Sequence, residues 1–351
     1  MDALIRMAAL LGLAAGLAVP ALSDERPSYV RIGTGSILGT YYPVGQALAE
    51  VLSRPVGSPP CDRNDHCGVV GLIAVAEASD GSVANVEAVE SGEFETALSQ
   101  STVVDAAYFG ARQFEGRGRA ENLRIIANLY PESVHLVVAR KSGIHKIADL
   151  KGKRISIDRT TSGTASDATM ILKAFGLTHK SLKLTEESPL KAADLVAEGK
   201  LDGFFYITGY PSPLITDLAE RTDIDIIPIA GTQAQSLVTQ SRFFSPGRIP
   251  AGTYKGIADV ETVQMGAQFI ANARVSADLI YAVTKTLWDP ANLKALARRH
   301  PQAAMIRLDQ ALQGITIPLH PGAERFYREI GLLKDGPLAA APTDRSRPQR
   351  P

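Results

Sequence analysis

YVRIGTGSILGTYYPVGQALAEVL, residues 29–52, predicts a strand, a glycine-rich turn and a helix in immediate succession. Residues 29–33 are mostly β-branched or aromatic and end at a glycine, which is typical of a strand. Apolar residues then recur at helical spacing, at Val44, Ala47, Leu48 and Val51. Thr40 is a suitable residue to cap that helix. The stretch therefore indicates an α/β unit whose turn lies at the carboxyl end of a strand.

The same alternation of strands and helices continues along the chain. Further strands are expected at residues 96–98, 123–129, 134–139, 154–157, 201–208 and 224–229. Helical stripes follow at residues 83–89, 168–175 and 276–288. Strands that alternate with helices predict parallel sheets with helices on both faces. The fold class is therefore α/β.

Two such units occur, one before about residue 130 and one after it. Residues 125–136 and 226–240 are the two stretches that we expect to cross between the units. The first lobe would then be discontinuous, with residues 24–130 and 232–336, and the second lobe would hold residues 131–231. This organisation predicts a cleft between two lobes, where ligand sites concentrate.

Composition excludes several classes of protein. The 351 residues include 37 basic and 37 acidic side chains, so the formal net charge is zero. A nucleic-acid-binding protein needs a basic surface, so we expect no nucleic-acid partner. A content of 45% hydrophobic and 21% charged residues is ordinary for a folded domain.

The two ends of the chain are expected to lie outside the folded lobes. Residues 1–23 contain a short apolar run that Pro20 ends, with small residues before a cleavage point after Ser23. This pattern is typical of a secretory signal peptide, and an uncleaved or lipid-anchored start is the alternative. Residues 337–351 are rich in Pro, Arg, Ser and Ala, which predicts a disordered tail. The protein is therefore expected in the periplasm.

Cys61 and Cys67 are the only cysteines of the chain. In an oxidising compartment we expect them to form a disulfide that closes a small polar loop. Metal binding by both cysteines, His66 and an aspartate is the alternative, although the spacing matches no standard zinc pattern.

Several turns after strands carry small, hydroxyl-bearing or aromatic residues and are candidate binding segments. A turn of this kind presents backbone N–H groups and the positive end of a helix dipole, which favour a carboxylate or phosphate. The glycine-rich turn misses the dinucleotide fingerprint, because its spacing is G-x-G-x-x-x-G. The candidate ligand-binding residues are Thr34, Gly35, Ser36, Thr40, Tyr41, Tyr42, Ser82, Gln100, Arg159, Ser162, Gly163, Thr164, Thr208, Gly209 and Tyr210.

The chemical inventory argues against an enzyme. The six histidines lack metal-ligand spacing, and neither an H-E-x-x-H nor a G-x-S-x-G motif occurs. His135 lies in an apolar strand and is expected to be a core or hinge residue, and His320 is expected to order a turn. Trp288 continues a helical stripe and is expected in the core. We predict no catalytic residues, no bound metal and no cofactor.

Six stretches resemble the TAXI group of solute-binding proteins, which serve TRAP transporters. They are residues 32–45 (IGTGSILGTYYPVG), 81–85 (GSVAN), 128–138 (NLYPESVHLVV), 142–153 (SGIHKIADLKGK), 162–164 (SGT) and 318–331 (PLHPGAERFYREIG). The resemblance implies the type II-like periplasmic-binding-protein fold, with two mixed sheets flanked by helices and a hinge beside the cleft. It also implies a ligand of the glutamate-like amino acid or dicarboxylate type.

The sequence thus predicts an exported protein that captures a small carboxylated solute by closing two lobes on it. The resemblance implies delivery to the membrane permease subunits of a TRAP transporter, by a protein that we expect to be a monomer. The alternative is a periplasmic sensor that reports its ligand to a membrane kinase, because both roles use the same cleft. An enzyme on the same fold is a further alternative, against which the missing acid, base and metal sets argue.

Overall fold

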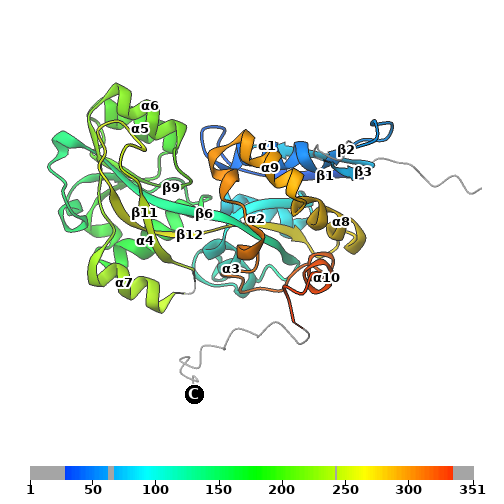
Figure 1. Ribbon diagram of the computed structural model, residues 1–351. Helices are drawn as coiled ribbons and strands as arrows, with labels where there is room; N and C mark the ends of the chain where they lie inside the picture. Colours follow the sequence, from blue (N-terminus) through cyan, green and yellow to red (C-terminus); the bar gives the residue numbers. More distant parts are fainter. Residues whose placement is uncertain (1–27, 62–66, 242, 335–351) are drawn as a thin grey trace, which may run out of the picture.

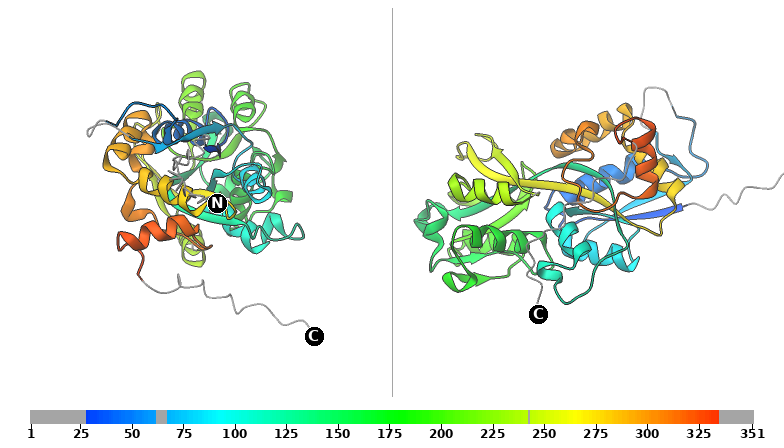
Figure 2. Two further views of the ribbon diagram at one scale, coloured as in Figure 1. Left: turned by 90° about the vertical axis from the view of Figure 1, so that its right-hand side faces the viewer. Right: turned by 90° about the horizontal axis from the view of Figure 1, so that it is seen from below.

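The computed structural model describes residues 28–61, 67–241 and 243–334. The predicted signal peptide, residues 1–23, and the predicted tail, residues 337–351, lie outside these ranges. The polypeptide forms two lobes that lie side by side (Figures 1 and 2). Two long strands, β6 (Leu123–Ala139) and β12 (Val260–Asn272), run antiparallel to each other through both lobes.

The first lobe is built from both ends of the described chain. Its amino-terminal elements are β1 (Ser28–Gly33), α1 (Tyr41–Leu52), β2 (Ser53–Arg54), β3 (Val69–Val70), β4 (Leu72–Glu77), α2 (Ser82–Ser91), β5 (Thr96–Gln100) and α3 (Ser101–Phe109). Its carboxyl-terminal elements are α8 (Ala277–Leu287), α9 (Pro290–Arg299) and α10 (Pro321–Glu329). The apolar stripe predicted on α1 is buried in one core with β1 and with these carboxyl-terminal helices.

The second lobe is continuous in sequence. It contains β7 (Arg154–Ser156), α4 (Gly163–Ala174), β8 (Lys183–Thr185), α5 (Pro189–Ala197), β9 (Gly203–Thr208), α6 (Pro213–Arg221), β10 (Ile224–Ile226), α7 (Gly231–Gln240) and β11 (Ser245–Ile249). Two separate apolar cores lie in this lobe, one with α4 and α7 and the other with α5 and α6. They cover opposite faces of the sheet, because neighbouring residues of β9 belong to different cores.

The strands are hydrogen-bonded in the order β3-β2-β4-β1-β5-β12-β6-β9-β7-β8. Strands β4, β1 and β5 are parallel in the first lobe, and β9, β7 and β8 are parallel in the second. Between them, β12 and β6 pair antiparallel with each other and with their outer neighbours. This arrangement confirms the α/β fold class and the two-lobed, periplasmic-binding-protein-like architecture. The two predicted sheets are joined into one curled mixed sheet, since β6 and β12 belong to both.

The first crossing lies where the sequence indicates, but as one strand instead of two. Residues 130–133 interrupt the apolar pattern, and Pro131 would normally end a strand. Strand β6 continues through Pro131 because its pairing with β9 starts only at Ser133. On the other side Pro131 lies opposite Gly266 of β12. The proline therefore occupies the point where β6 passes from one lobe to the other.

The prediction of a second crossing at residues 226–240 is wrong. Ala234 and Leu237 of α7 pack with Ile227 and Ile229 in a core of the second lobe. The chain returns instead along β12, whose residues 264–272 pair with β6. The boundary predicted at residue 232 therefore moves into β12, and residues 232–259 belong to the second lobe.

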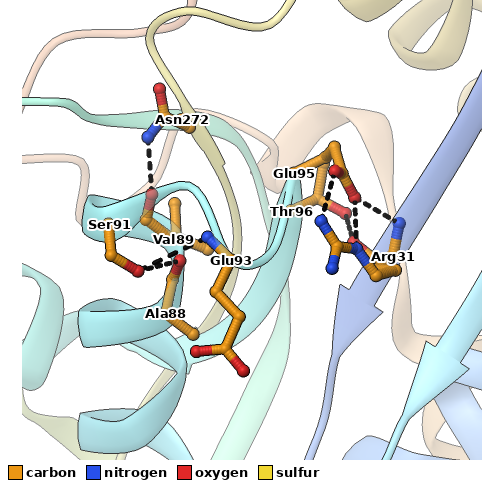
Figure 3. A network of polar contacts seen from close by, with 8 residues as sticks. All are labelled: Arg31, Ala88, Val89, Ser91, Glu93, Glu95, Thr96 and Asn272. Carbon is orange, nitrogen blue, oxygen red and sulfur yellow. Dashed lines mark hydrogen bonds and ion pairs between the residues drawn. The ribbon is translucent and has the colours of Figure 1, made fainter.

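A polar network holds the frame of the first lobe (Figure 3). The guanidinium of Arg31 on β1 forms a bidentate ion pair with Glu95, at 2.7 and 3.0 Å, and the Arg31 backbone N–H donates to the same carboxylate. The Thr96 hydroxyl donates to the Arg31 carbonyl oxygen. The Asn272 side chain, at the end of β12, donates to the Val89 carbonyl oxygen of α2 at 2.6 Å. These bonds tie β1 to the start of β5 and the end of β12 to α2.

The structure confirms the predicted disulfide between Cys61 and Cys67, whose Cα atoms are 5.7 Å apart. The buried side chain of Asn292, on α9, accepts from the Cys67 backbone N–H at 2.9 Å and donates to its carbonyl oxygen at 3.2 Å. Trp288 is buried as expected and donates to the Tyr327 hydroxyl. Within the described ranges, no helix has the length and apolar character that a bilayer crossing requires.

Candidate functional site

A small polar cavity of about 70 Å³ lies between the two lobes. This volume is far below the roughly 300–1,000 Å³ of a pocket for a drug-sized ligand. Residues of both lobes line it, so it is the cleft that the sequence predicts, with its walls in contact. The lining residues are Gly35, Ser36, Gly39, Thr40, Tyr41, Asp80, Gly81, Ser82, Gln100, Glu132, Asp158, Arg159, Ser162, Gly163, Thr164, Pro189, Tyr206, Ile207 and Thr208.

Direct contacts hold the lobes together around this cavity. The hydroxyl oxygens of Thr40 and Thr208 lie 3.2 Å apart, and the Gly209 backbone N–H donates to Thr40 Oγ1. Arg159 of the second lobe also pairs with Asp80 of the first at 2.7 Å, and both residues line the cavity. Because each of these pairs joins one lobe directly to the other, the structure describes a closed arrangement of the lobes.

Helices α1, α2 and α4 begin at the cavity. Their first residues are Tyr41, Ser82 and Gly163, and all three line the wall. The cap positions of α1 and α2, Thr40 and Gly81, make no side-chain hydrogen bond to the first turn. Amino ends of helices carry partial positive charge and N–H donors, which favour an anionic group. Three such ends from both lobes make this wall suited to a carboxylate or a similar anion.

Of the three helix amino ends, that of α4 has a side-chain cap. Ser162 Oγ accepts from the Ala165 backbone N–H at 3.2 Å, which is a side-chain cap. Thr164 Oγ1 accepts from the Ile207 backbone N–H of β9 at 3.2 Å. The Ser162 hydroxyl therefore orders the first turn of α4, and the Thr164 hydroxyl holds that turn against β9.

Another part of the cavity wall carries an acidic side chain, Glu132, which is not among the residues predicted from the sequence. Its side chain lies on β6 at the crossing, is 2% exposed, and accepts a 2.6 Å hydrogen bond from the Tyr41 hydroxyl. Burial raises the pKa of Glu132 to about 8, although the hydrogen bond from Tyr41 opposes this shift. Once ionised, this carboxyl attracts a cationic or hydrogen-bond-donating group, and a cation bound beside it would favour the ionised form. The cavity therefore combines three helix amino ends with a buried carboxyl group in one wall.

Other buried carboxyl groups lie around the same place. Burial raises the pKa of Asp158, in the cavity wall, to about 6. Burial also raises the pKa of Asp167 to about 7, and Asp167 accepts from Thr102 across the lobes at 2.8 Å. Gln100 Oε1 and Asp167 Oδ1 are buried and have no hydrogen-bond partner in the described part of the chain. Buried polar atoms normally bond to something, so Gln100, which lines the cavity, is a candidate to bond a polar solute.

Most of the predicted binding residues lie in the cavity wall. They are Gly35, Ser36, Thr40, Tyr41, Ser82, Gln100, Arg159, Ser162, Gly163, Thr164 and Thr208. Arg159 faces the cleft, where Asp80 takes up part of its capacity to bind an anion. Their binding roles stay predictions, because the geometry gives position and not affinity.

Four predicted residues lie outside the cavity wall. The Thr34 hydroxyl donates to the Glu77 carbonyl oxygen at 2.6 Å, so Thr34 braces the turn from behind. Gly209 packs against Gln302, and Tyr210 lines a different surface hollow. Tyr42 follows Tyr41 on α1, and a one-residue step rotates a side chain away from its neighbour's face.

Eight wall residues are not among the predicted binding residues, although the first three lie in turns that the sequence indicates: Gly39, Asp80, Gly81, Glu132, Asp158, Pro189, Tyr206 and Ile207. A signal was present for Glu132, which is a single acidic residue between apolar segments at 123–129 and 134–139. A buried carboxyl within an apolar strand usually has a specific partner or role. Tyr206 and Ile207 carried no such signal, because their place in the wall depends on how β9 pairs with β6.

The expected structural roles of two histidines are confirmed. His135 is fully buried in β6, where its ring nitrogens lie 3.0 Å from the Ser133 carbonyl oxygen and 3.0 Å from the Tyr254 hydroxyl. His320 caps α10 by accepting from the Gly322 backbone N–H at 3.2 Å. Among the residues that the structure describes, no three His, Cys, Asp or Glu side chains are grouped as metal ligands.

Comparisons with known proteins give one family and several similar folds. The sequence model of the NMT1-like family matches residues 32–331 of this chain. The alkanesulfonate-binding protein SsuA from Xanthomonas axonopodis pv. citri, bound to MOPS, is 16% identical over 82% of this chain and 86% of that one, with a TM-score of 0.46. The GluR0 ligand-binding core in complex with L-glutamate is 11% identical over 80% and 99%, also at 0.46. A histidine kinase sensor domain with similarity to periplasmic binding proteins is 15% identical over 82% and 99%, at 0.44.

Proposed function

The chain belongs to the NMT1-like family, and from that premise we propose that it is the extracytoplasmic solute-binding subunit of a TRAP-type transporter. Its resemblance to the TAXI group supports this assignment. The protein would act in the periplasm, bind one small solute without changing it, and pass it to the membrane permease subunits.

The mechanism is capture by lobe closure. Two strands, β6 and β12, connect the lobes, so one lobe can rotate against the other with little change inside either core. The cavity wall comes from both lobes. A solute that contacts both walls stabilises only the closed arrangement, and so it shifts the population toward closure.

The solute class follows from the two halves of the wall. The amino ends of α1, α2 and α4 favour a carboxylate. Glu132, whose pKa is raised to about 8, favours an ammonium group once it is ionised, so binding of an ammonium there would be coupled to release of its proton. A glutamate-like amino acid carries both groups, whereas a dicarboxylate would place a second anion near Glu132. The observation that carries the proposal is this pairing of helix amino ends with a buried carboxyl in one interlobe cavity. Between the two predicted ligand types, it favours the amino acid.

A thermal-shift screen of the purified protein against amino acids and matched dicarboxylates tests this proposal. A solute at a hundredfold excess over its dissociation constant adds roughly 2.7 kcal/mol to the stability. We expect a shift with glutamate-like amino acids at pH 7.5 and a smaller one with glutarate or succinate. Shifts with dicarboxylates alone would contradict the role given to Glu132.

Deletion of the gene distinguishes a role in transport from a role in sensing. Transport predicts that cells without the protein no longer take up the solute found in the screen. If uptake persists while a solute-dependent transcriptional response disappears, the protein is a sensor and the transporter assignment is wrong.

A further inference from the structure

Three glycines lie where the lobes meet, and each faces a side chain of the opposite lobe. Gly163 begins α4 in the second lobe and faces Gln100 and Ser82 of the first. Gly39, in the first lobe, faces Tyr206 of β9. Gly209 follows β9 and faces Gln302 of the first lobe.

A methyl group has no room at any of the three positions. A Cβ atom on Gly163 would overlap Gln100 Oε1 and lie 2.6 Å from Gln100 Cδ and 3.0 Å from Ser82 Oγ. On Gly39 it would lie 2.9 Å from the Tyr206 hydroxyl oxygen. Distances under 3.0 Å are ones that real Cβ atoms essentially never show. The crowding atoms therefore have to move.

The third position shows the same crowding nearer the hinge. A Cβ atom on Gly209 would lie 2.5 Å from Gln302 Cδ. Gln302 is buried, and its side-chain nitrogen donates to the Pro131 carbonyl oxygen of β6 at 2.7 Å. It is thus held in place at the crossing strand.

Backbone conformation does not explain these glycines. None of the three has a positive φ angle, so an alanine fits the backbone at each position. An alanine at Gly163 would even favour the helix, because glycine is a poor helix former. What these positions require is the absence of a side chain toward the other lobe. Every crowding atom belongs to the facing lobe, except the Ser36 carbonyl oxygen near Gly39. The crowding by the facing lobe therefore exists only when the lobes are together.

We propose that Gly39, Gly163 and Gly209 are closure positions, whose bare backbones let the two lobes approach to contact. They act through the lobe-to-lobe fit and not by binding the solute. The inference concerns the closing motion alone and holds whatever the solute is.

A cysteine pair reports closure without any solute. Thr40 Oγ1 and Thr208 Oγ1 lie 3.2 Å apart across the lobes, so Thr40→Cys with Thr208→Cys places two sulfur atoms close enough to bond when the lobes close. The rate of this cross-link under mild oxidation, followed by non-reducing gel and peptide mass mapping, measures access to the closed arrangement. Mapping also checks that Cys61 and Cys67 stay paired.

In this background, Gly163→Ala is expected to slow cross-linking by about tenfold or more, because overpacking of this kind is costly. Adding Gln100→Ala removes the crowding side chain and should restore the rate. The second pair is Gly39→Ala, with Tyr206→Phe as its relieving change. Gly35→Ala is the matched control, since a methyl there meets only ordinary contacts, at 3.6 Å or more.

Each result decides the inference. Slow cross-linking that the partner truncation restores supports it for each pair. Unchanged rates in Gly163→Ala and Gly39→Ala, or slow rates that Gln100→Ala and Tyr206→Phe do not restore, would overturn it. Failure of the parent pair to cross-link would overturn closure itself. Solute affinity enters none of these readouts, so they stand apart from the identity of the solute.

Discussion

The Tyr41 hydroxyl donates a 2.6 Å hydrogen bond to Glu132 Oε2, and both side chains are buried. Tyr41 begins α1 in the first lobe, and Glu132 lies on β6 where the chain crosses to the second. Desolvation also raises the pKa of Tyr41 well above its usual value, so the hydroxyl stays a donor. The bond fixes the one carboxyl of the hinge strand that faces the cavity.

Tyr41→Phe leaves the Glu132 carboxyl without this donor. Burying a polar group that loses its partner costs about 1–3 kcal/mol. We expect the free energy of unfolding from urea titration to fall by that amount. Tyr42→Phe is the matched control, because Tyr42 lies outside the cavity and outside this bond. Equal losses in both variants would show that the Tyr41–Glu132 bond stabilises nothing specific.

Stability should fall as the pH rises from about 6.5 to about 8. Burial raises the pKa of Glu132 to about 8 and that of Asp167 to about 7, above the values of exposed carboxyls. The folded protein therefore keeps protons that the unfolded chain releases, and the slope of unfolding free energy against pH is negative in this window. Glu132→Gln should flatten the slope between pH 6 and pH 8.5. An unchanged slope in urea titrations across that range would contradict the burial of an acidic Glu132.

The Arg159–Asp80 pair should contribute little to stability. Both side chains are more than two-fifths exposed, and exposed pairs are typically worth at most about 1 kcal/mol. Asp80→Asn is therefore expected to change the unfolding free energy by less than that. It also leaves the Arg159 guanidinium available, so the affinity for an anionic solute should rise and become more sensitive to salt. Calorimetric titration at two salt concentrations measures this, and a weaker affinity would mean that the pair organises the site.

The disulfide should stabilise the folded state modestly. Its loop is short, so the chain-entropy model gives roughly 2 kcal/mol. Cys61→Ser with Cys67→Ser should lower the unfolding free energy by about that amount, as should adding reductant to the wild type. If reductant lowers the stability of the double variant equally, the effect is unrelated to this bond.

The turns of the site could be predicted because their signals are local. The start of each helix is readable from a few residues, and the Ser162 side chain caps α4. Thr40 precedes α1 without a side-chain cap bond, and Ser82 is the first residue of α2 and not its cap. Tyr206 joins the wall through the pairing of β9 with β6, and Glu132 lies opposite Met265 in the pairing of β6 with β12. No short window of sequence encodes either pairing. Local chemistry was thus recoverable, and the residues contributed by strand register were not.

The second crossing was missed for a related reason. Residues 224–229 are a compact apolar run and resemble a crossing strand, whereas β12 carries Gln264 and Gln268 among its apolar residues. Gln268 is buried, and its side-chain amide donates to the Gly314 carbonyl oxygen at 3.1 Å. A hydrogen-bond partner from a distant part of the chain therefore allows Gln268 to be buried inside the strand. The local sequence pattern does not predict that partner.

The most direct test of solute binding at the amino end of α4 compares two substitutions of Ser162 whose side chains differ in one heavy atom. Ser162→Asp and Ser162→Asn both keep a residue that caps helices well, so the fold should be preserved in each. Only the aspartate adds negative charge where we place the carboxylate of the solute. Calorimetric titration with the amino acid found by thermal shift should show an affinity at least about tenfold weaker for Ser162→Asp than for Ser162→Asn, which corresponds to about 1.4 kcal/mol. Equal affinities in the two variants would contradict the account, because the solute's anionic group would then lie elsewhere.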